Sequence, residues 1–121
     1  MNELGSIHFD GFYRKLVANQ DIHQGETIVV LPLDSQDYPD QYSIEASPGI
    51  HINCEQSIAG AINHSCNPNA AVRHFRIIAW KCIKENEEIT IDYRKTEYKM
   101  AVPFECQCGF CESGTVIKGM E

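Results

Sequence analysis

The sequence predicts a mostly β, single-domain fold with little helix and a cysteine-rich C-terminal tail. The chain has 121 residues, which suits one domain and is short for two. Segments rich in β-branched and aromatic residues recur along it, and turn signals separate them. From Pro103 onward the character changes, because this stretch is rich in cysteine and turn-forming residues and cannot form a strand core alone.

Six segments have the composition of strands. They are LVANQDI (16–22), ETIVVLP (26–32), YSIEA (42–46), IHINC (50–54), RIIAWKCI (76–83) and EEITIDY (87–93). Turn-forming residues punctuate them at HQG (23–25), SPG (47–49) and KEN (84–86). Helix is expected only as a short turn within 54–63 and as a second one near 96–101.

Two of these units resemble each other. Residues 17–28 and 77–89 align at a constant offset, with Gly25 opposite Asn86, and both residue types tolerate a positive φ in a tight turn. We interpret the pair as two similar strand–turn–strand units, with chance similarity as the alternative.

Composition narrows the functional classes. The net charge is −7, from 17 acidic and 10 basic groups, which disfavours a direct nucleic-acid partner and favours a basic, lysine-containing protein partner. No apolar run approaches the roughly 20 residues of a membrane span, so no membrane partner is expected. The N-terminus lacks the pattern of a secretory signal, so an intracellular location is expected: cytoplasmic in a bacterium, nuclear or host-directed otherwise.

The cysteine cluster predicts a structural Zn²⁺ ion. Cys106, Cys108 and Cys111 form C-x-C-x-x-C, and a tetrahedral zinc site needs a fourth ligand from elsewhere. Cys66 is the preferred candidate because it lies in a turn, and Cys54, Cys82 and His64 remain alternatives. Reduced free thiols or an opportunistic disulfide are the other interpretations of the cluster.

The segment INHSCNPNAAV (62–72) carries the densest polar chemistry. Six polar or thiol side chains lie between apolar stretches, at 63–67 and 69. Such groups beside a core are costly unless they bind one another or a ligand. A self-satisfied polar turn is the alternative interpretation.

Taken together, INHSCNPN (62–69), EEITIDY (87–93) and PFECQCGFCESGTVIKG (103–119) resemble the SET-domain lysine methyltransferases with a post-SET cysteine tail. GETIVVLP and YSIEASPGIHI resemble the segments before the motif, and TEYKMAVPFECQCG resembles small bacterial members. The resemblance implies a SET domain at 1–102 and a post-SET zinc tail at 103–121. The implied fold is a set of small twisted sheets with a pseudoknot.

This resemblance implies an S-adenosylmethionine-dependent enzyme that methylates a protein lysine, with a histone or histone-like protein as a candidate substrate. Asn63 and His64 would contact the cofactor, Asn63 through its amide oxygen, and Phe104 would lie near the adenine. Tyr93 matches the catalytic tyrosine. Tyr42 and Ile91 are expected in the lysine channel, where the position of Ile91 influences the number of methyl groups. Cys66 would supply the fourth zinc thiolate.

The chain also departs from the family. Tyr13-Arg14-Lys15 replaces the usual Gly-x-Gly, so Arg14 or Lys15 is a candidate partner for the cofactor carboxylate, with two solvated cations as the alternative. The last cysteine gap is two residues instead of four. A catalytically weak module that binds S-adenosylmethionine or a lysine-rich tail is therefore the competing function.

Overall fold

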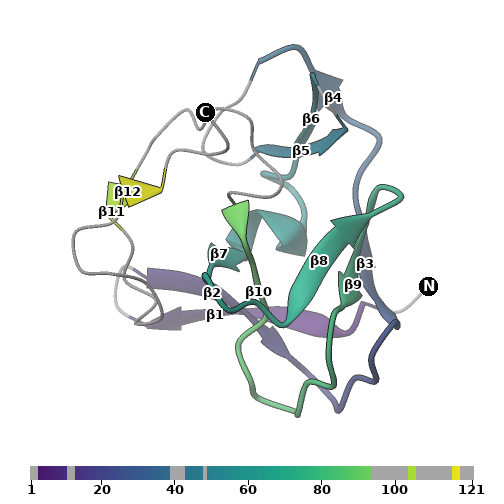
Figure 1. The fold of residues 1–121 in the computed structure, drawn as a ribbon, viewed down its shortest axis with the longest axis vertical. Coiled ribbons are helices and arrows are strands. Elements are labelled where there is room, and N and C mark those ends of the chain that lie inside the picture. Colours follow the sequence, from purple (N-terminus) through teal and green to yellow (C-terminus); the bar gives the residue numbers. More distant parts are fainter. Residues whose placement is uncertain are drawn as a thin grey trace.

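The computed structural model describes residues 3–10, 13–38, 43–47 and 49–93, together with the backbone of two short strands at 104–105 and 116–117. The chain is mostly β, as predicted, and its strands form five small sheets within the described residues (Figure 1). Nowhere in this part of the chain does a helix have the length and apolarity needed to cross a membrane.

The elements follow one another closely along the chain. The first half contains β1 (Gly5–Asp10), β2 (Tyr13–Ala18), β3 (Thr27–Val30), β4 (Ser35–Gln36), β5 (Ser43–Ser47) and β6 (Ile50–Asn53). The second half contains the 3-10 helix η1 (Ile58–Ala61), then β7 (Asn63–His64), β8 (Ala70–Arg73), β9 (Arg76–Ala79), β10 (Thr90–Ile91), β11 (Phe104–Glu105) and β12 (Val116–Ile117). The short helical turn predicted within 54–63 is confirmed as η1, and the one predicted near 96–101 lies outside the described residues.

The sheets are built mainly from neighbouring segments. β1 pairs antiparallel with β2, the order β3-β9-β8 forms a second sheet, and β4-β6-β5 forms a third. β7 and β10 pair in parallel, and β11 pairs with β12. Isoleucines dominate the core between these sheets, and the largest fully buried side chains include Leu16, Ile22, Ile28, Ile77, Ile83, Ile89 and Ile91.

Several strand predictions were too long, and two strands were missed. The 76–83 segment forms a strand only to Ala79, and 87–93 pairs only at Thr90 and Ile91. In both cases the partner strand is short, so the ladder ends although the residue types would allow it to continue. The sequence gave no warning of β1 or β8.

The internal resemblance is a structural repeat. The N–H of Ile22 donates to the Ile83 carbonyl at 2.7 Å, and the N–H of Ile83 donates back to Ile22 at 2.8 Å. Around this pair the same bonds recur 61 positions apart: Ala18 N–H donates to Glu87 and Ala79 N–H donates to Glu26, each at 2.9 Å. Both predicted turn positions have positive φ, 89° at Gly25 and 73° at Asn86. The two strand–turn–strand units therefore face each other about an approximate two-fold axis.

Candidate active site

Two segments far apart in the sequence meet at the parallel pair of β7 and β10. Thr90 lies opposite Asn63 and Ile91 lies opposite His64, and the N–H of Ser65 donates to the Ile91 carbonyl at 3.0 Å. The pairing places the end of the INHS segment beside the end of the ITIDY segment (Figure 1). The expectation that these two motifs lie side by side is therefore correct.

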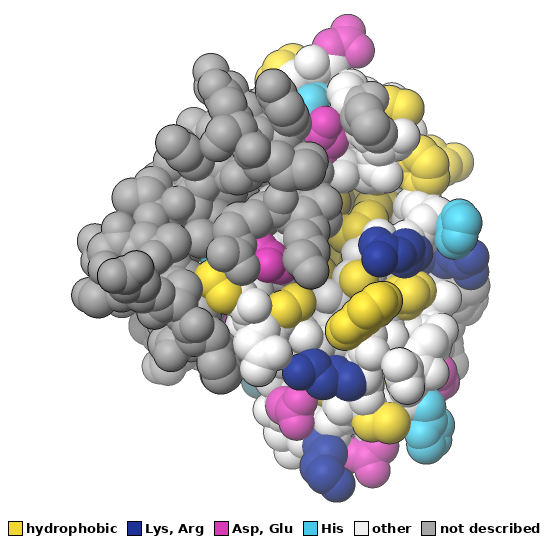
Figure 2. All heavy atoms as spheres, viewed as in Figure 1, with side chains coloured by type: hydrophobic (Ala, Val, Ile, Leu, Met, Phe, Trp, Pro, Cys, Tyr) yellow, Lys and Arg dark blue, Asp and Glu magenta, His cyan; other side chains and the backbone are white. Residues whose placement is uncertain are grey.

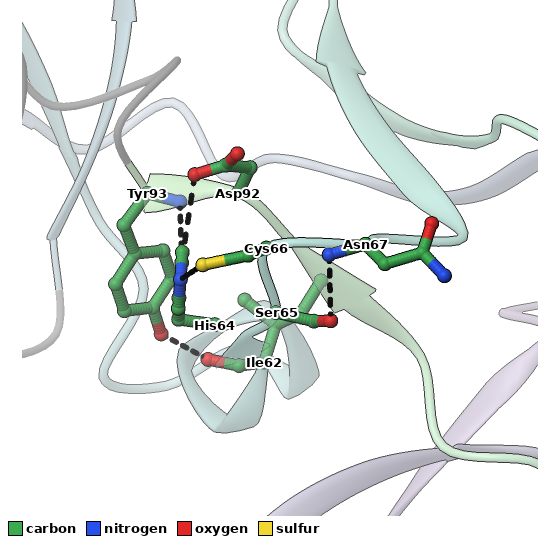
Figure 3. A network of polar contacts seen from close by, with 7 residues as sticks. All are labelled: Ile62, His64, Ser65, Cys66, Asn67, Asp92 and Tyr93. Atoms are coloured by element: carbon green, nitrogen blue, oxygen red, sulfur yellow. Dashed lines mark hydrogen bonds and ion pairs between the residues drawn. The ribbon is translucent and has the colours of Figure 1, made fainter. Parts of the chain in front are cut away.

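His64 is buried at the centre of this junction, with a side chain that is 1% exposed. Its Nδ1 accepts the backbone N–H of Tyr93 at 3.0 Å, and its Nε2 lies 3.2 Å from the Cys66 sulfur (Figure 3). Because Nδ1 acts as an acceptor, the ring proton belongs on Nε2, which then donates to the sulfur. The Asp92 carboxylate lies 3.6 Å from Nδ1, and with this tautomer that contact is not a charge pair.

Tyr93 lies against His64, with ring centroids 5.5 Å apart and planes tilted by 52°. Its hydroxyl donates to the backbone carbonyl of Ile62, immediately before the Asn63–His64 strand (Figure 3). Since this bond uses the hydroxyl proton, the lone pairs of the oxygen remain available as acceptors. The phenol is thus oriented by the segment that the parallel pairing brings beside it.

Asn63 joins β7 to two other elements. Its side-chain nitrogen donates to the Arg14 carbonyl at 2.8 Å and to the Glu88 carboxylate at 3.0 Å. These two bonds fix the orientation of the amide, so its oxygen faces the other way as an acceptor. Sequence reasoning missed Glu88, because nothing in the run Glu85–Glu88 marks which carboxylate faces inward.

Arg14 is attached to η1 by its guanidinium, which donates to the Gly60 carbonyl at 2.9 Å. A Cβ at position 60 would lie 2.3 Å from the Cys54 carbonyl oxygen, so only glycine allows this close backbone approach. Adjacent strand residues point to opposite faces, so Lys15 projects away from the face that carries Arg14. The structure brings Arg14 to Asn63 and leaves Lys15 apart from it.

The remaining predicted site residues divide into two groups. Ile91 is fully buried on β10 and lines a pocket with Asp92. Tyr42, Cys106, Cys108, Cys111 and the side chain of Phe104 lie outside the described residues.

The zinc prediction is therefore only partly visible. Cys66 is half-buried, Cys54 is fully buried and Cys82 is exposed. Within the ranges that the structure describes, no group of three or more His, Cys, Asp or Glu side chains is placed to hold a metal ion. The contact from the His64 ring N–H suits a thiolate at Cys66, since ligating thiolates commonly accept such hydrogen bonds.

Comparisons with known proteins agree on the family. A sequence model of the SET domain matches residues 13–94. The chain is 38% identical over 73 residues to the histone-lysine N-methyltransferase TRX1 of Oryza sativa, and the match covers 54% of this chain and 7% of that protein. It is 30% identical over 71 residues to the methyltransferase flvH of Aspergillus flavus, covering 55% of this chain and 39% of that protein. The chain thus spans well under half the length of these curated relatives.

Solved structures show the same fold. A candidate histone methyltransferase from Plasmodium falciparum superposes with a TM-score of 0.59 at 20% identity, covering 77% of this chain and 95% of that one. The methyltransferase domain of the human histone-lysine N-methyltransferase SETMAR gives 0.64 at 18% identity, covering 88% and 55%. At these identities the likeness establishes the fold, including the predicted set of small sheets.

Proposed function

The chain belongs to the SET-domain family, and from this premise we propose that it transfers a methyl group from S-adenosylmethionine to a lysine side chain of a protein. One observation carries the proposal: the parallel pairing of β7 and β10 gathers Asn63, His64 and Tyr93 at one junction. A direct displacement needs a methyl donor and an amine held on either side of such a junction, and it needs no redox group.

The amine must be neutral to attack. A free lysine has a pKa near 10.4, so deprotonation near pH 7.4 costs about 4 kcal/mol. An apolar channel disfavours the charged ammonium, and the sulfonium of the cofactor repels it further. Fully buried Ile91, two residues before Tyr93, supplies an apolar wall of the kind such a channel requires.

Tyr93 is proposed as the catalytic residue that orients the amine. Its hydroxyl proton is committed to the Ile62 carbonyl, so the oxygen can accept a hydrogen bond from the lysine nitrogen. A phenol with a pKa near 10 is a weak base at neutral pH, so the role is positional and electrostatic.

The cofactor carries an amino-acid group with one ammonium and one carboxylate. We propose that the Asn63 amide oxygen accepts from the ammonium, with the Glu88 carboxylate close by, and that Arg14 receives the carboxylate. Both ring nitrogens of His64 are engaged within the protein, so its cofactor contact would use the backbone. Lys15 and Phe104 remain predicted cofactor residues, and Tyr42 a predicted channel residue.

We further propose a domain division at about residue 102, with a structural zinc tail at 103–121. Cys66 would be held with Cys106, Cys108 and Cys111, and the ion would staple the tail to the active-site motif. The His64 N–H that points at Cys66 supports this ligand choice over Cys54 or Cys82.

The proposed substrate is a basic, lysine-containing protein, with histones as the first candidates. The net charge of −7 favours a cationic partner, and two of the relatives carry names that describe histone-lysine methylation. The competing interpretation, a module that binds without turnover, is an outcome of the test below.

The test incubates the protein with labelled S-adenosylmethionine and core histones and detects methyl-lysine by mass spectrometry. Tyr93→Phe should lower kcat at least about tenfold while cofactor affinity, measured by titration calorimetry, changes less than about twofold. Equal loss of both would contradict the assigned role of Tyr93. Cofactor binding without any methyl transfer would favour the binding module.

A further inference from the structure

β8 lies at the open edge of its sheet. The strand order is β3-β9-β8, so among the described strands β8 has a hydrogen-bonded ladder on one side only. Edge strands present backbone donors and acceptors that another extended segment can use.

The phase of the β8–β9 ladder shows which groups face outward. Arg73 lies opposite Arg76 across a two-residue turn, and the N–H of Trp80 donates to the Asn69 carbonyl at 2.8 Å. Odd-numbered residues of this strand therefore bond to β9, and the alternate residues point their backbone groups away from it. At the open edge these alternate residues are Ala70 and Val72.

Val72 is the accessible position of the two. Its carbonyl accepts the Arg73 guanidinium at 2.9 Å, and its N–H has no printed partner within the described part of the chain. The Arg73 guanidinium also lies 5.6 Å from the centroid of the Trp80 ring. A charged side chain that covers one edge carbonyl is a common protection for an unpaired strand.

A pocket lies along this edge, and we call it the β8 pocket. It is lined by Pro68, the four residues of β8, Trp80, Ile91 and Asp92. Its walls are mostly carbon, and Trp80 is 53% exposed. Figure 2 shows hydrophobic side chains gathered over this part of the molecule, with Lys and Arg side chains beside them.

The β8 pocket is continuous with the candidate active site. Ile91 and Asp92 form part of its lining, and the next residue is Tyr93. Asp92 also lies 3.6 Å from the ring of His64. A segment bound along β8 would therefore lie beside the residues proposed to orient the lysine.

We propose that the edge of β8 and the β8 pocket form a docking site for an extended segment of the protein substrate, which adds as a fourth strand and inserts an aliphatic side chain beside Trp80. The inference rests on the proposed function and adds a substrate class: proteins with an aliphatic residue at a fixed distance from the target lysine. Backbone pairing would supply affinity, and the pocket would supply specificity.

The chain offers a direct probe, because Trp80 is its only tryptophan. We would titrate the full chain with short synthetic peptides that carry a central lysine in an alanine–serine background, with one leucine walked through the flanking positions. A peptide with leucine at the right offset should shift Trp80 emission saturably and have at least about a fivefold lower KM than the leucine-free peptide. No emission shift with any peptide would overturn the docking site.

Backbone pairing is tested on the same protein with N-methylated peptides. N-methylation at alternate positions of the best peptide should weaken its binding about fivefold to tenfold, since each blocked position loses a hydrogen bond. N-methylation without effect at every position would overturn strand addition.

A matched pair of variants tests the protein side. Val72→Pro removes the outward N–H and leaves the ladder to β9 intact, whereas Val72→Ala keeps the N–H and trims the side chain. We expect Val72→Pro to raise the peptide KM about fivefold to tenfold and Val72→Ala to raise it less than about twofold. Equal effects of the two would contradict the proposal.

The outcomes also separate docking from catalysis. A Trp80 response to lysine peptides without methyl transfer would keep the docking site and reject the enzyme. Methyl transfer to peptides without a Trp80 response would keep the enzyme and reject the docking site.

Discussion

The two turn residues Gly25 and Asn86 solve the same local problem with different side chains. Both have left-handed φ, at 89° and 73°, where residues with a Cβ other than asparagine and aspartate are strained. Their common conformation is what the sequence resemblance of the two units reflects. The identity of these residues therefore records backbone geometry and not a ligand.

Gly25→Ala should destabilise the fold by about 1 kcal/mol. A Cβ at this position meets nothing within 4 Å, so the cost is backbone strain without steric overlap. Urea unfolding followed by circular dichroism measures it. Gly25→Asn is the matched control and should cost clearly less, as Asn86 does in the other turn. Equal costs for the two substitutions would contradict the assignment of the effect to φ.

Arg14 and Lys15 form a second residue-scale comparison, because they are adjacent on β2 and face opposite ways. Only Arg14 bonds to η1 and offers its carbonyl to Asn63. Arg14→Ala should raise the Kd for S-adenosylmethionine about tenfold, whereas Lys15→Ala should change it less than about twofold. Titration calorimetry checks both variants, and a larger effect at Lys15 would reverse the assignment.

At the scale of elements, strand length is set by the partner and not by the residues alone. β10 was predicted from a seven-residue segment, yet it pairs only at Thr90 and Ile91 because β7 ends after His64. β1 escaped prediction because its polar residues and Gly5 resemble a loop. A Cβ at Gly5 would lie 2.9 Å from the Leu16 side chain, so that glycine is there to let β1 pack closely.

The repeat about the Ile22–Ile83 pair makes an element-scale prediction. Both side chains are 1% exposed, and each is the equivalent of the other. Ile22→Val and Ile83→Val should each cost about 1 kcal/mol of unfolding free energy, with similar values for the two. Chemical denaturation measures the costs. Val30→Ala, at a site that is 45% exposed, is the control and should cost less than either.

At the scale of the whole molecule, the site was predictable where a motif specifies it and hidden where pairing creates it. Asn63, His64 and Tyr93 follow from the motifs, and the parallel pair of β7 and β10 brings them together. Glu88 and Asp92 enter only because this pairing turns their side chains toward Asn63 and His64. Parallel strand pairing between distant segments is decided by the whole fold, and local composition does not encode it.

The proposed zinc staple predicts a difference between two cysteines of one chain. Cys66→Ser should lower the zinc content of purified protein from about one ion per chain to a small fraction, because a structural site needs its fourth ligand. Cys82 is exposed, so Cys82→Ser should leave the content unchanged. Atomic absorption measures both variants. Zinc-free wild-type protein would remove the staple, and equal loss in both variants would assign the fourth ligand wrongly.

Charge acts over the whole surface, and it makes the last prediction. A protein of net charge −7 attracts a basic substrate before contact, and salt screens such attraction beyond about 8 Å at 0.15 M. The KM for histone tails should therefore rise several-fold between low and physiological salt, while kcat changes little because the reacting groups are enclosed. Steady-state kinetics with a lysine peptide of zero net charge supplies the control, and its KM should be nearly independent of salt. A neutral peptide with the same salt dependence would show that salt acts on the enzyme itself and not on the approach of a cationic substrate.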